Sequence, residues 1–288
     1  MDDGTVGLIL VTGAAGKTGR AVLRQLAARG VATRALVRRG DQSSTVRAAG
    51  AGEVTVGDLL DRQGVRAAAA GATVVYHICP NMSRDEEAIG EIALEAARGA
   101  GARIVYHSVL MPEVEAMPHH WRKAKVEERI RSSGLAFAIL RPTAYMQNVL
   151  QQRRTIVEHG VYPVPYAQAS VVSLVDLEDV AVAAAHVLLE DSHDGGVYEL
   201  CADELLDQAG IADALTRQLG RPVTLEVLDR PDWAAGARRA GLEEEVIGDL
   251  LRMFEYYERH GMTGSPDQLA SLLGRRPTSF AEFLKREF

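Results

Sequence analysis

The chain of 288 residues carries 32 Lys and Arg against 39 Asp and Glu, a formal net charge of −7. At about 150 residues per domain, this length allows one large domain or two small ones. The acidic balance disfavours nucleic-acid and membrane partners, and two isolated cysteines indicate neither a disulfide framework nor a metal site. The longest apolar stretches are far shorter than the roughly 20 residues of a membrane helix. We therefore expect a soluble, cytoplasmic protein without a metal.

Strand-like runs alternate with helical patterns through the first half of the chain. Continuous apolar or β-branched runs predict buried strands, and apolar residues at helical spacing predict the helices between them. This alternation predicts an α/β fold with a doubly wound parallel sheet and right-handed crossovers. The predicted strands are 6–11, 32–37, 53–56, 73–79, 103–108 and 135–140, and the predicted helices are 17–29, 42–49, 61–70, 83–98 and 119–133.

The alternation breaks after Arg141 and Pro142. From there the pattern predicts a helix over 177–189, a strand over 197–201, and helices over 203–219 and 242–259. We therefore expect a doubly wound domain over 1–142. Residues 143–288 are expected to form a smaller, α-rich lobe that shares strands and helices with the first domain.

A glycine-rich turn lies between the first predicted strand and the first predicted helix. Glycines spaced G-x-x-G-x-x-G allow a tight turn, and the helix N-terminus then presents free N–H groups to a pyrophosphate. A nucleotide-hydrolase phosphate loop needs a glycine five positions before Gly16, where Val11 stands, so that alternative fails. The residues expected to contact the dinucleotide here are Gly13, Ala15, Gly16, Lys17, Thr18 and Gly19.

The end of the second predicted strand indicates which dinucleotide binds. An NAD site places an acidic residue near this position, but here the chain reads Arg34 to Arg39 without a carboxylate before Asp41. A guanidinium pairs with the 2′-phosphate of NADP(H), and we expect Arg38 to do so while Arg39 solvates a loop. After the third strand, Asp58 and Leu59 are expected to border the adenine, with capping of the next helix as the alternative for Asp58.

These motifs together resemble the NmrA-like group of atypical short-chain dehydrogenases/reductases. The likeness continues through 176–180 and 273–280 and so spans nearly the whole chain, and its most specific stretches are 133–142 and 146–148. The resemblance implies an N-terminal dinucleotide-binding Rossmann domain over 1–142, a small substrate-binding lobe over 143–288 and a substrate cleft between them. It leaves the activity open, because the group includes quinone, dye and isoflavone-type reductases as well as dinucleotide sensors that regulate transcription factors.

The wider superfamily uses a Tyr and a Lys four residues apart on one helix. Here Lys123 occupies the Lys position and is expected to hold the nicotinamide ribose, with a solvated lysine as the alternative. The residue four before it is His119, which is either a proton donor or a surface residue, and His120 shares that role in part. The helix is expected to start at Pro118, so its dipole disfavours an imidazolium at His119. The superfamily's catalytic Ser falls at Ser108 or Val109.

The remaining expectations concern the loops that follow the fourth and sixth strands. Cys79 and Pro142 are expected to border the nicotinamide, and Cys79 is expected to pack rather than act as a nucleophile. An apolar stripe on the last long helix either closes the cleft or packs in the core. The stripe comprises Val246, Leu250, Met253, Phe254 and Tyr257, and the expected substrate contacts are Asn81, Met82, Tyr145, Met146 and Asn148.

The function that follows is an NADPH-dependent reductase of an aromatic or quinone-type small molecule, with the tailoring of a natural product as one form of this role. Two alternatives stay open. The missing Tyr favours a non-catalytic NADP(H) sensor that regulates a protein partner, and cofactor-dependent oxygenation of an aromatic substrate has the same sequence features. We expect a monomer or a homodimer.

Overall fold

The computed structural model describes residues 7–288, so the predicted start of the first strand at Val6 lies outside the described residues. The chain forms two compact units. Of the described residues, unit 1 contains 7–112, 122–141 and 180–198, and unit 2 contains 113–121, 142–179 and 199–288. Among residues 7–288, no helix is long and apolar enough to cross a membrane.

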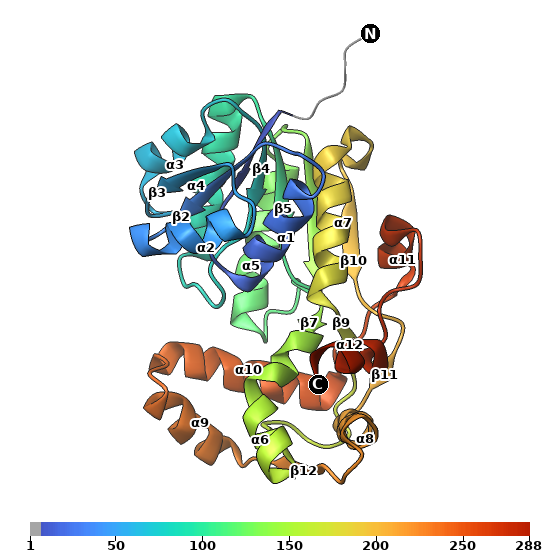
Figure 1. Ribbon diagram of the computed structural model, residues 1–288. Coiled ribbons are helices and arrows are strands. Elements are labelled where there is room, and N and C mark those ends of the chain that lie inside the picture. Colours follow the sequence, from blue (N-terminus) through green and yellow to red (C-terminus); the bar gives the residue numbers. More distant parts are fainter. Residues whose placement is uncertain (1–6) are drawn as a thin grey trace. The chain divides into compact units, whose positions relative to one another are not determined.

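Unit 1 is built on a seven-stranded sheet with the order β10-β6-β5-β4-β1-β2-β3 (Figure 1). The pairs β1–β2, β1–β4, β2–β3, β4–β5 and β5–β6 are all parallel, which confirms the predicted doubly wound sheet. Its strands are β1 (Leu8–Val11), β2 (Thr33–Val37), β3 (Glu53–Val56), β4 (Ala72–His77), β5 (Arg103–His107), β6 (Phe137–Pro142) and β10 (Val197–Leu200).

Helices connect consecutive strands of this sheet, as the alternation predicts. Helix α5 crosses the boundary between the units after Trp121, and α7 crosses it after Asp179. The helices are α1 (Lys17–Ala27), η1 (Gly40–Gln42), α2 (Ser43–Ala48), α3 (Arg62–Ala69), α4 (Glu86–Ala100), α5 (Pro118–Arg131), α7 (Leu177–Leu189) and η3 (Asp191–His193).

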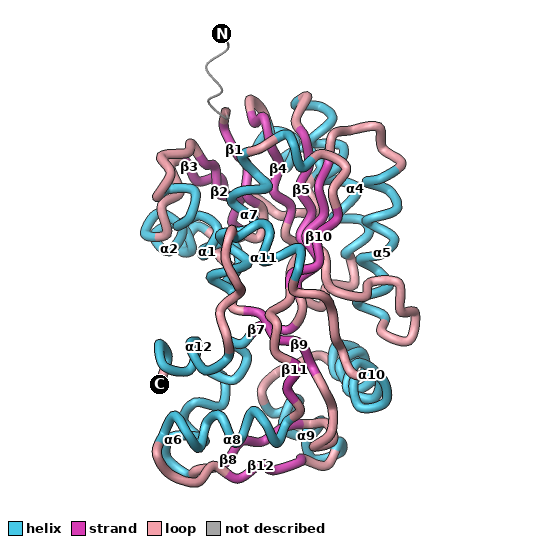
Figure 2. The backbone as a smooth tube through the Cα atoms, turned by 90° about the vertical axis from the view of Figure 1, so that its right-hand side faces the viewer, coloured by secondary structure: helices cyan, strands magenta, loops and turns pink. Residues whose placement is uncertain are grey.

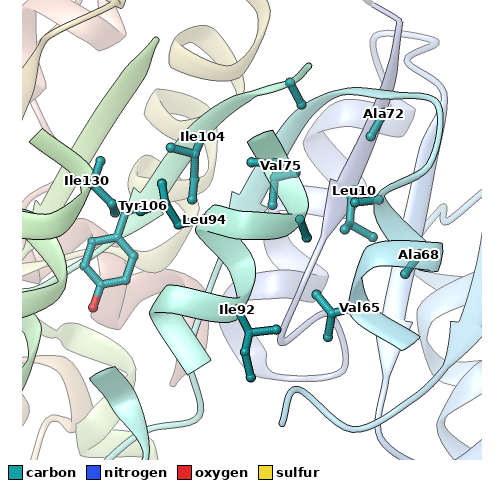
Figure 3. Packing of buried hydrophobic residues seen from close by; sticks show 14 of the residues in the cluster. Leu10, Val65, Ala68, Ala72, Val75, Ile92, Leu94, Ile104, Tyr106 and Ile130 are labelled. Carbon is teal, nitrogen blue, oxygen red and sulfur yellow. The ribbon is translucent and has the colours of Figure 1, made fainter. Parts of the chain in front are cut away.

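The core of unit 1 lies between the sheet and the helices α3, α4 and α5. Leu10, Val75 and Ile104 of the sheet pack against Val65 of α3 and Ile92 of α4, all at most 5% exposed (Figure 3). Tyr106 lies at one side of this cluster with its hydroxyl turned away from the apolar side chains. Polar atoms therefore border the core near the carboxyl end of β5.

Unit 2 contains two small sheets and the remaining helices (Figure 2). In one sheet β9 pairs with β7 and β11, and in the other β8 pairs with β12. The elements are β7 (Ala144–Tyr145), η2 (Met146–Gln152), α6 (Arg153–His159), β8 (Val161–Val164), β9 (Val172–Val175), β11 (Leu205–Leu206), α8 (Gln208–Leu219), β12 (Thr224–Val227), α9 (Arg230–Arg239), α10 (Glu244–His260), α11 (Asp267–Leu273) and α12 (Phe280–Glu287).

One predicted helix of unit 2 is wrong at its start. The stretch predicted as a helix over 203–219 begins with strand β11, which pairs with β9, and α8 starts only at Gln208. Asp207 sets this start, because its side chain accepts a hydrogen bond from the Gly210 N–H at 2.7 Å.

Buried carboxylates tie the C-terminal segment to the start of α7. Asp176 accepts hydrogen bonds from Arg286, and Asp179 accepts them from Arg275 and from the Thr278 N–H. Both carboxylates are fully buried, so they need these partners. The two motif stretches 176–180 and 273–280 thus have a structural role within unit 2.

Candidate functional site

The glycine turn joins β1 to α1 with very little space around its backbone. Gly13 has φ +57°, and a Cβ there would lie 2.6 Å from the Ile78 carbonyl oxygen. A Cβ at Gly19 would lie 2.6 Å from Ala14 Cα. Helix α1 has no side-chain cap at Gly16 and no acid in its first turn, so the positive end of its dipole favours an anion there. These residues fit a dinucleotide pyrophosphate.

Two arginines follow β2, and the structure gives them different neighbours. Arg39 pairs with Asp41 of its own loop at 3.1 Å. Arg38 Nε lies 3.7 Å from Asp58 Oδ2 in an exposed pair that joins the ends of β2 and β3. Arg38 is therefore available to a 2′-phosphate at that edge, and this role stays a prediction.

Asp58 does not cap α3. Its Oδ1 accepts a hydrogen bond from the Leu60 N–H at 2.9 Å, and the cap of α3 is Asp61, whose side chain accepts from the Gln63 N–H. The capping alternative for Asp58 is wrong, because the helix begins three residues later than that cap would require. Asp58 and its half-buried neighbour Leu59 lie in the loop after β3, where an adenine contact is predicted.

A buried polar group, here called the Glu86 cluster, lies at the carboxyl ends of β1, β4 and β5. It comprises Thr12, His77, Glu86, Tyr106 and Lys123. The Glu86 Oε1 atom accepts hydrogen bonds from the Tyr106 hydroxyl at 2.6 Å and from Lys123 Nζ at 3.0 Å. His77 stacks on the Tyr106 ring at 5.7 Å, and its Nδ1 lies 3.0 Å from Thr12 Oγ1. Lys123 is thus an ion-paired, buried side chain, so the solvated alternative is wrong.

The titration of this cluster is governed by burial and by one charge pair. Burial raises the pKa of Glu86, but the Lys123 charge and the hydrogen bonds from Tyr106 and Lys123 outweigh it, and the pKa lies below its ordinary value. Burial lowers the pKa of His77 to about 4. It lowers the pKa of the neighbouring His107 to about 3, helped by the Lys123 charge. Both imidazoles are therefore neutral near pH 7.

A second buried group, the Glu127 cluster, comprises Ser108, Glu127, Arg131 and Arg141. Ser108 Oγ donates to Glu127 Oε1 at 2.6 Å, and Arg141 approaches both carboxylate oxygens, at 3.0 and 2.6 Å. Arg131 adds a bond of 2.8 Å. The Ser108 proton is therefore held by Glu127, while Val109 is half-buried in the next position. The catalytic role expected at Ser108 or Val109 stays a prediction.

The loop after β4 carries three predicted contacts. Cys79 is buried, and burial raises the pKa of its thiol, which favours packing over nucleophilic attack. Asn81 is exposed, and Met82 is buried with φ 60°, a left-handed conformation unusual for a side chain of this size. Such strain is often found at ligand-binding positions.

The predicted residues of unit 2 lie in the first turn of α5, at the end of β6, in β7 and in η2. Helix α5 starts at Pro118, as predicted, and His119 and His120 in its first turn are both buried. The surface alternative for His119 is therefore wrong. Met146 and Pro142 are buried, Tyr145 is half-buried and Asn148 is exposed, all of them in or beside β7.

Aromatic rings gather elsewhere in unit 2. Phe254 of α10 makes edge contacts with Tyr166 at 5.5 Å and with Trp233 of α9 at 4.7 Å. Tyr257, one turn further along α10, lies 6.5 Å from His120. Phe254 and Tyr257 are the buried members of the predicted stripe, while Val246, Leu250 and Met253 are half-buried. The stripe therefore packs within the unit, mainly through its aromatic members.

Sequence reasoning missed Glu86, Tyr106, His77 and Glu127. Glu86 and Glu127 lie in helices rich in charged residues, where the local pattern predicts that a glutamate is exposed. Only their partners, which are distant in the sequence, show that they are buried. His77 and Tyr106 carried a weak signal, because a polar side chain at the end of a buried strand of a doubly wound sheet is a candidate ligand contact.

Known proteins match this chain over nearly its full length. A sequence profile of the NmrA-like family matches residues 5–284. The (4-alkanoyl-5-oxo-2,5-dihydrofuran-3-yl)methyl phosphate reductase of Streptomyces griseus is 32% identical over 96% of each chain, and the NAD(P)H azoreductase of Xenophilus azovorans is 26% identical over 96% of this chain and 97% of its own.

A solved structure with the same fold carries a bound dinucleotide. The crystal structure of the NADPH-dependent quinone oxidoreductase QOR2 from Escherichia coli, complexed with NADPH, superposes with a TM-score of 0.85 at 27% identity. The match covers 97% of this chain and 99% of that one. Together with the family profile, this confirms the resemblance and the Rossmann-like fold: the chain belongs to the NmrA-like family.

Proposed function

We propose that this chain is an NADP(H)-dependent oxidoreductase that reduces an aromatic or quinone-type small molecule. The glycine turn is the observation that carries this proposal. Gly13 and Gly19 stand where a Cβ does not fit, and the helix that follows offers an uncapped N-terminus without an acid. The similar proteins that are named as reductases of azo, quinone and unsaturated lactone compounds support the reaction class.

Each part of the cofactor has a proposed partner in this chain. The turn from Gly13 to Gly19 binds the diphosphate, and Arg38 binds the 2′-phosphate through its guanidinium. Asp58 and Leu59 border the adenine. Lys123 donates hydrogen bonds to the nicotinamide ribose, and Cys79 and Pro142 border the nicotinamide.

The reaction needs one hydride and one proton. NADPH, when bound, supplies the hydride to the acceptor, which then takes up a proton. His119 is the proposed donor of that proton, since the superfamily's Tyr is absent from its position and a buried imidazole can donate a hydrogen bond to a carbonyl oxygen. The proposed acceptor is a flat conjugated molecule, including an aromatic natural-product intermediate. Its proposed contacts are Asn81 and Met82 in unit 1 and Tyr145, Met146 and Asn148 in unit 2.

A panel of acceptors tests this function. We expect oxidation of NADPH, monitored by the decrease in its absorbance, with at least one member of a set of quinones, azo dyes, aromatic ketones and unsaturated lactones. Tight NADPH binding without turnover on every member would contradict the oxidoreductase and favour the sensor alternative. A pull-down with NADPH and with NADP+ then identifies a sensor by a partner that responds to the redox form. Oxygen uptake in the same assays would indicate oxygenation.

A further inference from the structure

The Lys123 ammonium is buried but has few partners. An ammonium has three N–H donors, and burying it without compensation is costly. Lys123 is 8% exposed, yet Glu86 is the one acceptor it meets among residues 7–288, while the face of the Tyr106 ring lies 5.5 Å away. Two donors are thus left for atoms that come from outside the chain.

Glu86 is suited to hold this ammonium in place. It is the first residue of α4, where the helix dipole favours a carboxylate, and it is 2% exposed. Its Oε1 is shared by Lys123 and the Tyr106 hydroxyl, so a strand and two helices fix its position. Lys123 cannot swing away without leaving this carboxylate unpaired in the interior.

The cluster is also connected to the glycine turn. Thr12 follows β1, and its hydroxyl contacts both His77 and the Ile78 backbone, while Ile78 packs directly on Gly13. In the sheet, β4 separates β1 from β5, so the turn and the Glu86 cluster share one carboxyl edge. The order of the strands changes direction between β1 and β4, which is where doubly wound sheets bind dinucleotides.

We propose that Glu86 is a positioning residue that, together with Tyr106, holds Lys123 so that its two remaining N–H donors meet the ribose hydroxyls of NADP(H). This inference rests on the proposed role of Lys123 in cofactor binding. Glu86 itself touches neither the cofactor nor the substrate, and it acts through the charge and orientation of Lys123. A merely structural ion pair would affect folding stability but not the pH dependence of cofactor affinity.

The groups around Lys123 make a pH test interpretable. Burial places the pKa of His77 at about 4 and that of His107 at about 3, and it raises those of Tyr106 and Cys79 above their ordinary values. Glu127 is held by Arg131 and Arg141. None of these imidazole, phenol and thiol groups therefore changes charge between about pH 6 and about pH 9.

The test compares NADPH affinity in Glu86→Gln, Lys123→Met and the double variant, measured by fluorescence titration at about pH 6 and about pH 9. Glu86→Gln leaves the buried ammonium without its counter-charge, so this variant should bind NADPH roughly tenfold more weakly than wild type at the higher pH and less so at the lower. In the Lys123→Met background, Glu86→Gln should cause no further loss of NADPH affinity.

Glu87→Gln is the matched control. Glu87 is the residue next to Glu86 in α4, and it pairs with Lys125 and Arg129. The NADPH affinity of Glu87→Gln should stay within about twofold of wild type.

Thermal melting of each variant establishes that it is folded. If Glu86→Gln does not fold, Glu86→Asp replaces it. This variant keeps the negative charge, but its shorter side chain places the carboxylate farther from Lys123. We expect a severalfold loss of NADPH affinity that is the same at both pH values. Wild-type affinity in a folded Glu86→Gln or Glu86→Asp, or an equal loss from Glu86→Gln with and without Lys123, would overturn the inference. NADPH binding is measured without an acceptor, so a wild-type chain that binds NADPH but reduces nothing contradicts the proposed function alone.

Discussion

Helix α5 contributes to two buried carboxylate clusters, and they differ in how completely their charges are satisfied. In the Glu127 cluster, the planar guanidinium of Arg141 covers both carboxylate oxygens, and Arg131 and Ser108 fill the remaining positions. In the Glu86 cluster, the Lys123 ammonium has three N–H donors, and one of them donates to the Glu86 carboxylate. We therefore call the Glu127 cluster closed, and we call the Glu86 cluster open because two N–H donors of Lys123 meet no acceptor among residues 7–288.

The largest expected effect is on the closed cluster. Glu127→Leu removes a carboxylate that is 1% exposed and that forms ion pairs with Arg131 and Arg141, so we expect a loss of about 3 to 5 kcal/mol in the free energy of unfolding. Denaturant unfolding measures it. NADPH affinity of the folded variant should match wild type, and a selective loss of affinity would show that this cluster is not merely structural.

Acid should act on the open cluster, because it contains a buried imidazole and the Glu127 cluster has none. The pKa of His77 is depressed from about 6.5 when unfolded to about 4 when folded, so the unfolded state binds more protons between these values. The stability from His77 is therefore complete above about pH 6.5 and is lost as the pH falls through about 4, by roughly 2 to 3 kcal/mol. Unfolding curves across this range check it. His77→Gln should reduce the slope, and the buried His107, whose pKa is lowered to about 3, contributes the part that remains. An equally steep decline in that variant would place the acid sensitivity elsewhere.

Lys123→Met tests cofactor binding by the open cluster. Because it also leaves the buried Glu86 carboxylate without its ion-pair partner, it lowers stability as well, and affinity is measured on the folded variant. We expect NADPH affinity to fall roughly tenfold, which corresponds to about 1.4 kcal/mol, because the ribose loses its charged donor. Lys125→Met on the same helix is the control, since Lys125 is more exposed and pairs with Glu87. Titration of both variants with NADPH measures the difference. Equal affinities would indicate that the open cluster binds something other than the cofactor.

The smallest effect is expected at the surface, in the exposed pair between Arg38 and Asp58. Arg38→Ala should weaken NADPH binding severalfold while leaving NADH affinity and the melting temperature unchanged, because exposed ion pairs contribute little to stability. Arg39→Ala is the control, since Arg39 is engaged by Asp41. If NADPH and NADH affinities fell together, the 2′-phosphate would have to bind at another residue.

Local patterns predicted the frame of unit 1 well. The bounds of β3 and α7 agree with prediction, and the other strands of the first half overlap their predicted ranges, because a buried strand and an amphipathic helix each carry their own periodicity. Unit 2 was predicted poorly. Its short strands β8 and β12 pair across more than 50 residues, and β11 lies in a stretch whose own pattern favoured a helix.

The sequence by itself determined the glycine turn, the arginine at the end of β2 and the placement of Lys123 on a helix four residues after His119. These are properties of neighbouring residues, and local spacing is enough to recognise them. Only the tertiary structure decided that Lys123 is paired with Glu86, 37 residues earlier, and that Ser108 is engaged by Glu127. The local sequence pattern predicts that charged residues on helices are exposed to solvent. Their burial follows from contacts with partners on strands and helices that are distant in the sequence.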